Sequence, residues 1–270
     1  MRKRMGLLAF LLMVVVVLSL AAVTPVHRAN ADDDEEERPF AEAHLFFELN
    51  DTDGDLGIHA LIDGDAWKKL EIEDPKERQI LLIWVMGRLR RQGLTEIFFE
   101  SAEPSFDDLA PANFFKRFPE GTYEIGGTTL DGKELESKVE LSHKMPAPPG
   151  GISLSGTPVN LENVDCDKED TIPKVGGSQP VVISWAAVTT SHPEIGTPNN
   201  APVMIHNYEV VVEVETGEFT SVFSVTLPPD VTEMTIPPQV LALGEEFKYE
   251  ILVREENFNQ TAIESCFKKE

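Results

Sequence analysis

Apolar and polar residues alternate at period two in three runs in the last third of the chain. The runs cover residues 180–185, 205–214 and 241–253, and the first alternates only loosely. Such alternation lets a strand bury one face and expose the other, and the turn-rich spacers between the runs are typical of an antiparallel sandwich. We therefore predict a mainly β fold, and a role in binding rather than in catalysis.

The first half of the chain carries shorter runs of the same kind. The expected strands cover residues 44–49, 57–63, 67–72, 80–91, 93–100, 122–125 and 137–142. The run that begins at residue 80 is continuously apolar at its start, so it fits a buried strand or a helical turn. Gly87 and the neighbouring β-branched residues favour the strand.

One short helix is expected among these strands. Ser105 followed three residues later by Asp108 is a typical helix start. Phe114, Phe115 and Phe118 then fall at helical spacing, which indicates core packing. The overall prediction is a mainly β protein of two β-sandwich domains, with one short helix in the first.

Composition divides the chain into five segments. We expect a signal peptide at residues 1–31, an acidic disordered tail at 32–42, an N-terminal β-rich domain at 43–145, a Pro/Gly linker at 146–151 and a second domain at 152–270. The leader has a basic start, an apolar stretch and a small-residue cleavage site. The alternative is a leader retained as a membrane anchor, because its apolar stretch reaches the lower limit for spanning a bilayer.

The formal net charge of −24 narrows the class of partner. Such an acidic surface repels nucleic acid and anionic membranes, so we expect neither as a ligand. Cations, basic partners or plain solubility remain as explanations of the charge.

The second domain resembles a fibronectin type III domain. Trp185 stands where that family places its core tryptophan, Tyr208 and Val210 match the third strand, and Phe247 and Tyr249 match the sixth strand. Further matches lie at residues 223–228, 235–237 and 264–267. The resemblance implies an immunoglobulin-like β-sandwich with Trp185, Tyr208, Phe247 and Tyr249 in its core, used as a spacer or binding module. It departs from the family where Phe247 replaces the usual corner tyrosine. The N-terminal half resembles no family that we can name.

The chain holds two cysteines, Cys166 and Cys266. In an oxidising compartment an even pair indicates a disulfide, and we expect one here. The alternative is two unpaired buried thiols. A single pair with no neighbouring histidine cluster is not a zinc site.

Asp51, Asp53 and Asp55 alternate like the first three ligands of a calcium loop. The match fails further on, because Leu56 stands at the glycine position and Ile62 at the position of the bidentate glutamate. We therefore carry two interpretations of this segment, a calcium-binding β-turn and a hydrophilic hairpin turn without metal.

The sequence contains no nucleophile elbow, phosphate-binding glycine loop or metal-ligand spacing of histidines, so we expect no enzyme. The function that we predict is an exported, non-enzymatic binding or structural module with an extracytoplasmic protein or a glycan as its partner. The first alternative is a calcium-dependent or carbohydrate-binding module, for which Trp67 is the expected exposed aromatic, while Trp84 is expected in the core. The second alternative is an exported hydrolase. The basic cluster from Arg88 to Arg91 is expected on a strand, as a solvated face or as a docking site for acidic partners or for the protein's own acidic tail.

Overall fold

The computed structural model describes residues 38–176 and 180–270, so the expected signal peptide lies outside the described residues. Among the residues that are described, no helix is both long and apolar enough to cross a bilayer. Of the expected acidic tail, residues 38–42 are described, and they are ordered. Arg38 bridges to Leu135 and the Phe40 ring is buried, because the chain already pairs with the first domain at this point.

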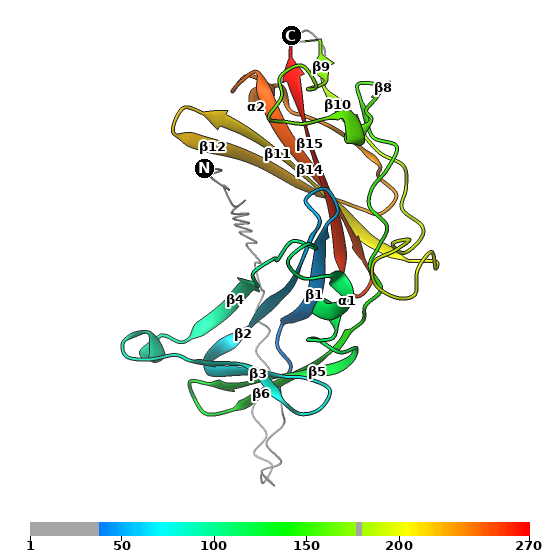
Figure 1. Cartoon of the computed structure of the whole chain (residues 1–270). Helices are drawn as coiled ribbons and strands as arrows, with labels where there is room; N and C mark the ends of the chain where they lie inside the picture. Colours follow the sequence, from blue (N-terminus) through cyan, green and yellow to red (C-terminus); the bar gives the residue numbers. More distant parts are fainter. Residues whose placement is uncertain (1–37, 177–179) are drawn as a thin grey trace. The chain divides into compact units, whose positions relative to one another are not determined.

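The C-terminal half contains two packed sheets (Figure 1). The smaller sheet has the order β13-β10-β7-β8, and the larger one contributes the order β12-β11-β14-β15. The members of the smaller sheet are β7 (Ser153–Leu154), β8 (Thr157–Pro158), β10 (Val182–Ser184) and β13 (Glu233–Thr235). The long strands are β11 (Ile205–Thr216), β12 (Phe219–Leu227), β14 (Glu246–Glu255) and β15 (Gln260–Lys269), and β9 (Lys174–Val175) pairs with β15. This half has the two-sheet, mainly β architecture that the sequence predicts.

The side chains that carried the resemblance fill the space between these sheets. Trp185, Tyr208, Phe247 and Tyr249 are all buried in one apolar cluster. The Tyr208 hydroxyl accepts a hydrogen bond from the backbone N–H of Val188 at 2.8 Å. The alternating residues of β11 and β14 therefore face the core as their period-two pattern indicates.

A second helix, α2 (Pro238–Leu241), precedes β14 in the C-terminal half, where no helix was expected from the sequence. Its Pro238 stands in the first turn, where the missing N–H costs no hydrogen bond and the fixed φ favours a helix. A one-turn 3₁₀ helix, η2 (Leu161–Asn163), lies earlier in the same half.

The N-terminal half is built around the long strand β2 (Asp55–Glu73). β2 pairs with four other strands, and β5 pairs in turn with β6. The other members are β1 (Glu42–Asn50), β3 (Gln79–Trp84), β4 (Leu94–Glu100), β5 (Gly121–Thr129) and β6 (Glu134–Leu141). One face of these strands encloses an apolar core that includes Phe47, Trp67 and Tyr123.

The expected helix is present but shorter than predicted. α1 spans Pro111–Phe115 and adds Phe114 and Phe115 to the core. Ser105 instead bonds to the Asp108 carboxylate at 3.2 Å within a turn. The reason is Pro111, whose ring would clash with the carbonyl four residues earlier if a helix ran on from Ser105.

The strand expected at residues 80–91 also ends early, at Trp84. Gly87 has a φ of +57°, which breaks the extended backbone. The 3₁₀ helix η1 (Leu89–Arg91) follows, so Arg88 and Arg90 do not share a strand face as predicted.

The two halves share one sheet, because β1 pairs in parallel with β15 (Figure 1). Glu48 lies opposite Gln260 in this register. Asn259 is fully buried at the junction, where it accepts a hydrogen bond from the N–H of Phe47 at 2.9 Å and donates to the carbonyl of Ser142 at 2.8 Å. The expected domain boundaries stay a prediction, but the sequence did not indicate that a sheet runs across them.

The segment expected as a linker, residues 146–151, is held by backbone contacts. The carbonyl of Pro146 accepts a bond from Thr261 at 2.7 Å, and the N–H of Ala147 donates to Thr190 at 2.9 Å. These bonds tie the segment to the C-terminal half of the chain.

Candidate functional site

A chain of polar side chains crosses the face of the shared sheet that is turned away from the cores. Alternation explains its position, because Phe47 of β1 and Ile58 of β2 face the N-terminal core, so Glu48 and His59 must face the other way. The same parity places Gln260 of β15 beside Glu48. Residues from both halves therefore meet on one surface.

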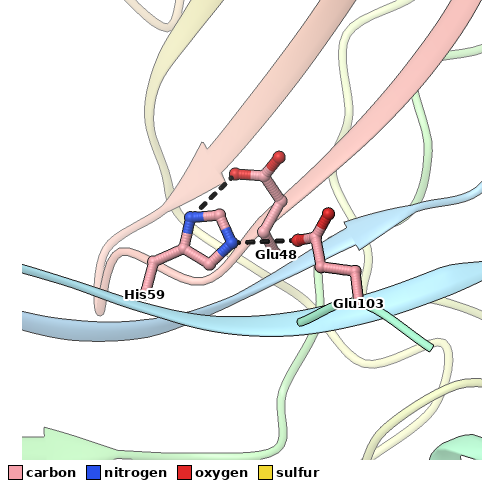
Figure 2. A group of neighbouring side chains, drawn as sticks. All are labelled: Glu48, His59 and Glu103. Atoms are coloured by element: carbon pink, nitrogen blue, oxygen red, sulfur yellow. Dashed lines mark hydrogen bonds and ion pairs between the residues drawn. The ribbon is translucent and has the colours of Figure 1, made fainter. Parts of the chain in front are cut away.

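His59 lies between two carboxylates (Figure 2). Its Nδ1 is 3.5 Å from Oε2 of Glu48, and its Nε2 is 3.0 Å from Oε1 of Glu103. The His59 side chain is buried, with 3% of the residue exposed, while the two glutamates are partly buried. Among the described residues this is the one group of three metal-ligating side chains whose ligand atoms all lie within 4.8 Å of one another.

Gly57 makes this arrangement possible. A Cβ atom at this position would lie 2.4 Å from Oε1 of Glu103 and 3.0 Å from Nε2 of His59, both closer than van der Waals contact allows. A glycine in the interior of a strand weakens the strand, so it fits a place where another group must approach the backbone closely. Here that group is the Glu103 carboxylate.

A second layer of side chains holds Glu48. Gln260 donates to its carboxylate, and Arg254 donates to the Gln260 carbonyl oxygen at 2.8 Å. Arg254 also lies 3.9 Å from the Glu209 carboxylate, to which Ser224 donates at 2.6 Å. This network fixes the Glu48 carboxylate against the imidazole.

The cluster carries an excess of buried negative charge. Burial raises the pKa of Glu48, and it raises the pKa of Asp55 to about 7 with help from the nearby charges of Glu103 and Asp53. Burial alone would lower the pKa of His59, but the hydrogen bond to Glu103 and the charges of Glu48, Glu103 and Glu100 outweigh it and raise that pKa. The arrangement therefore favours a cation at its centre.

The three aspartates of the expected calcium turn are not brought together in this way. Asp51 accepts a hydrogen bond from Nε2 of His192 at 3.0 Å. The side chain of Asn50 accepts the N–H groups of Thr52 and Asp53 at 3.1 Å each, as in an ordinary Asx turn. Calcium binding by this turn stays a prediction.

The expected disulfide is confirmed. Cys166 and Cys266 are bonded, with 5.9 Å between their Cα atoms, and no free cysteine remains in the described part of the chain. The bond ties the long segment before β9 to the last strand.

A second candidate surface is formed by residues 79–98, which we name the β3–β4 arm. Its connecting loop extends beyond the sheet (Figure 1). Of the eleven large hydrophobic side chains that are exposed in the described part of the chain, six lie on this arm. They are Ile80, Leu82, Trp84, Met86, Leu89 and Phe98.

The tryptophans of the first half are placed opposite to expectation. Trp67, predicted to be exposed, is fully buried, whereas Trp84, predicted in the core, is 51% exposed. The tip of the arm carries Arg88, Arg90 and Arg91, all exposed. None of these three arginines has a carboxylate within 4.0 Å among the described residues, in a chain with 47 acidic residues.

No protein-family model matches this sequence, and no curated protein matches it. Solved structures with a similar arrangement include a two-domain fibronectin type III segment of chicken tenascin, at 14% identity and a TM-score of 0.28, covering 84% of this chain and 97% of that one. The FN1–FN3 domains of chicken CNTN1 match at 8% identity and a TM-score of 0.33, covering 86% of this chain and 65% of that one. A 1.5-MDa bacterial ice-binding adhesin matches at 10% identity and a TM-score of 0.24, covering 86% and 65%. At these values the likenesses say nothing about function.

Proposed function

We propose that this chain is an exported, non-enzymatic binding or structural module that engages another protein through its β3–β4 arm. The observation that carries the proposal is the concentration of exposed apolar side chains on the arm of an otherwise strongly acidic protein. Large exposed apolar patches mark interaction sites in soluble proteins, and three of the arm's exposed side chains share one side of β3. Trp84 and the arginines belong to the residue types that dominate binding energy at interfaces.

The arm suits recognition by strand addition. In the described residues β3 pairs with β2 alone, so its other edge offers backbone N–H and C=O groups. Ile80, Leu82 and Trp84 alternate along this strand and point to one side of it, where Lys69 lies 5.8 Å from the Trp84 ring. A partner strand would gain main-chain bonds from the edge and specificity from the alternate side chains.

The charge of the arm indicates an acidic partner. Arg88, Arg90 and Arg91 at its tip, which pair with no carboxylate of the part of the chain that the structure describes, would attract acidic groups of a partner, and those groups would gain directional hydrogen bonds. The disulfide supports an oxidising compartment outside the cytoplasm as the place where the partner is met.

A double variant, Leu82→Ser with Trp84→Ser, tests the proposal. The oxidised protein is immobilised, exposed to the exported fraction of its source cells, and the retained proteins are quantified by mass spectrometry. We expect the variant to retain at least roughly tenfold less of one specific protein than the wild type. Truncation of hot-spot side chains should cost more than about 1.4 kcal/mol of binding free energy, which corresponds to a tenfold loss of affinity.

The matched control is Phe219→Ser, which removes another exposed apolar side chain far along the chain from the arm. It should retain the same protein as the wild type. The proposal fails when no protein is retained, or when the arm variant and the control retain it equally. Circular dichroism confirms beforehand that both variants are folded.

A further inference from the structure

Both ring nitrogens of His59 face a carboxylate, which leaves one of them without a suitable partner when the imidazole is neutral. A neutral ring carries one N–H and one lone pair. If one nitrogen donates to its carboxylate, the other directs its lone pair at a carboxylate that is also an acceptor. In a buried position such a contact needs either a second proton on the ring or a metal cation between the two acceptors.

We propose that Glu48, His59 and Glu103 form a binding site for a divalent transition-metal ion such as Zn²⁺. Imidazole and carboxylate ligands together suit this class of ion. The proposal does not rely on partner binding by the β3–β4 arm or on calcium binding by the expected turn, although Phe98 of the arm and Asp55 of the turn lie near the cluster.

His192 shows what a satisfied histidine looks like in the same protein. Its Nε2 lies 3.0 Å from the Asp51 carboxylate, while its Nδ1 accepts the N–H groups of Glu194 and Ile195 at 3.1 and 2.8 Å. One nitrogen therefore donates and the other accepts, so a neutral ring is fully paired. His59 is buried to a similar degree but lacks the two N–H donors.

The distances fit a metal site that closes by small side-chain rotations. Ligand atoms about 2.0–2.1 Å from a tetrahedral ion lie roughly 3.3–3.5 Å from one another. One ion binds one ring nitrogen, so the two carboxylates cannot stay on opposite sides of the ring: Nε2 lies 3.0 Å from Glu103, and the Glu48 carboxylate, now 3.5 Å from Nδ1, would turn toward the same ion. One ligand atom from each residue already lies within 4.8 Å of the others. Glu48 and Glu103 are partly exposed, so both carboxylates have room to turn and water can complete the coordination.

The surroundings are those of a built site. Gly57 leaves space for the Glu103 carboxylate, and Gln260 orients the Glu48 carboxylate from the next strand. Such outer partners commonly fix the ligands of metal sites. The rings of Phe46 and Phe98 lie 5.5 and 5.9 Å from the imidazole and limit access of water to it.

The net charge around His59 also favours a dication. Glu100 of β4 and Asp55 of β2 add their charges to those of Glu48 and Glu103. Arg254, a base on the same surface, is engaged by Gln260 and Glu209. A divalent ion would offset charge that a single proton on His59 leaves uncompensated.

The test is isothermal titration of the metal-free, oxidised protein with ZnCl₂ at pH 7.5, with millimolar Mg²⁺ present to occupy weak acidic surface sites. We expect saturable binding of one Zn²⁺ per chain. His59→Gln and Glu103→Gln should each weaken binding by roughly tenfold or more. His192→Gln, which changes a histidine that is already paired, should weaken it less than twofold.

The folding of each variant is checked by circular dichroism without metal, and Glu103→Gln decides the matter if His59→Gln does not fold. Absence of saturable binding, or equal affinity in the wild type and Glu103→Gln, overturns the proposal. A ¹⁵N spectrum of the ring provides a second readout. Two protonated nitrogens on His59 that persist in excess Zn²⁺ would show that a proton alone holds the cluster together, and would also overturn it.

Discussion

Glu250 provides the sharpest test of the electrostatics of the shared sheet. It lies in the middle of β14 with 9% of the residue exposed, and its Cα partner across the ladder is Glu264 of β15. Burial raises the pKa of Glu250 from 4.5 to about 9, with the charges of Glu48, Glu264 and Glu209 adding to the effect. The folded protein therefore holds this carboxyl protonated at neutral pH.

Because the pKa of Glu250 is raised in the folded state, its contribution to the free energy of unfolding falls as pH rises. The unfolded chain releases the Glu250 proton above pH 4.5, whereas the folded chain keeps it up to about pH 9. The contribution of this proton to stability is full below pH 4.5 and is lost as pH rises through about 9. At pH 7.5 the loss amounts to at most about 4 kcal/mol, at about 1.36 kcal/mol per pH unit.

The variant Glu250→Gln removes this dependence, because the amide resembles the protonated carboxyl and does not titrate. Taking half of the upper limit to allow for water near the group, we expect the variant to be about 2 kcal/mol more stable than the wild type at pH 7.5. This corresponds to a rise in Tm of about 4–8 °C for a chain of this size. Near pH 4.5 the two proteins should melt together.

The assay is calorimetry of both proteins between pH 4.5 and 8.5, with the difference in Tm plotted against pH. Other titrating groups, such as Asp55 and Glu255, are common to both proteins and cancel in the difference. Glu218→Gln, at an exposed position before β12, serves as the control and should shift Tm equally at all pH values. A difference between Glu250→Gln and wild type that stays flat or falls with pH would refute the reasoning.

Four further predictions concern single features of the structure. Trp67→Ala should lower the free energy of unfolding by about 3–5 kcal/mol in urea titrations, while Trp84→Ala should change it by no more than about 0.5 kcal/mol; equal effects would contradict the burial assigned to each. Cys166→Ser should cost about 4–5 kcal/mol by the chain-entropy model, because the disulfide spans 100 residues, and the wild type with reductant should match the variant. Asn259→Ala should cost about 3 kcal/mol, because it leaves buried backbone groups of the N-terminal half unpaired, and an unchanged urea midpoint would argue against its role at the junction. Zn²⁺ affinity should fall as pH drops from 8 to 6, because the ion competes with a proton for His59, whose pKa is raised. The displaced proton passes to the buffer, so the heat of titration should differ between buffers of different ionisation enthalpy. Heats that are the same in all buffers would contradict this competition.

The C-terminal half could be predicted because apolar and polar residues alternate along its long strands. In β11 and β14, buried residues such as Tyr208 and Tyr249 alternate with polar ones, and that alternation is visible in the sequence. The strands of the smaller sheet are only two or three residues long, too short to show a period. Their place followed from the resemblance of the residues around Trp185.

Trp67 was misplaced because of a local irregularity that the sequence does not show. Simple alternation puts Trp67 on the same face as Lys69, which predicts exposure. The register of β2 shifts between these two residues, and the extra residue turns Trp67 into the core. Trp84 was misplaced for a different reason, because the apolar run from residue 80 contains no polar position to mark the exposed face of an edge strand.

Two of the three residues of the candidate metal site could have been predicted from the turn at residues 51–54. If Asn50 and Asp55 close a hairpin, then Glu48 lies opposite Gly57 and His59 lies on the same face two pairs further along. Glu103 could not be found in this way, because it comes from an irregular segment after β4.

The burial of His59 also could not be predicted from the sequence, because the alternation of apolar and polar residues assigns its position to the solvent-facing side of the strand. β15 pairs with the edge of β1 that β2 leaves free, and it brings Gln260 against Glu48. β1 therefore lies inside a wide sheet and not at its edge. The pairing of parallel strands that brings Glu48 opposite Gln260, 212 residues further along the chain, leaves no side-chain period in the sequence. The same pairing therefore accounts both for the continuous sheet that the sequence did not indicate and for the desolvated carboxylates that give the cluster its affinity for a cation.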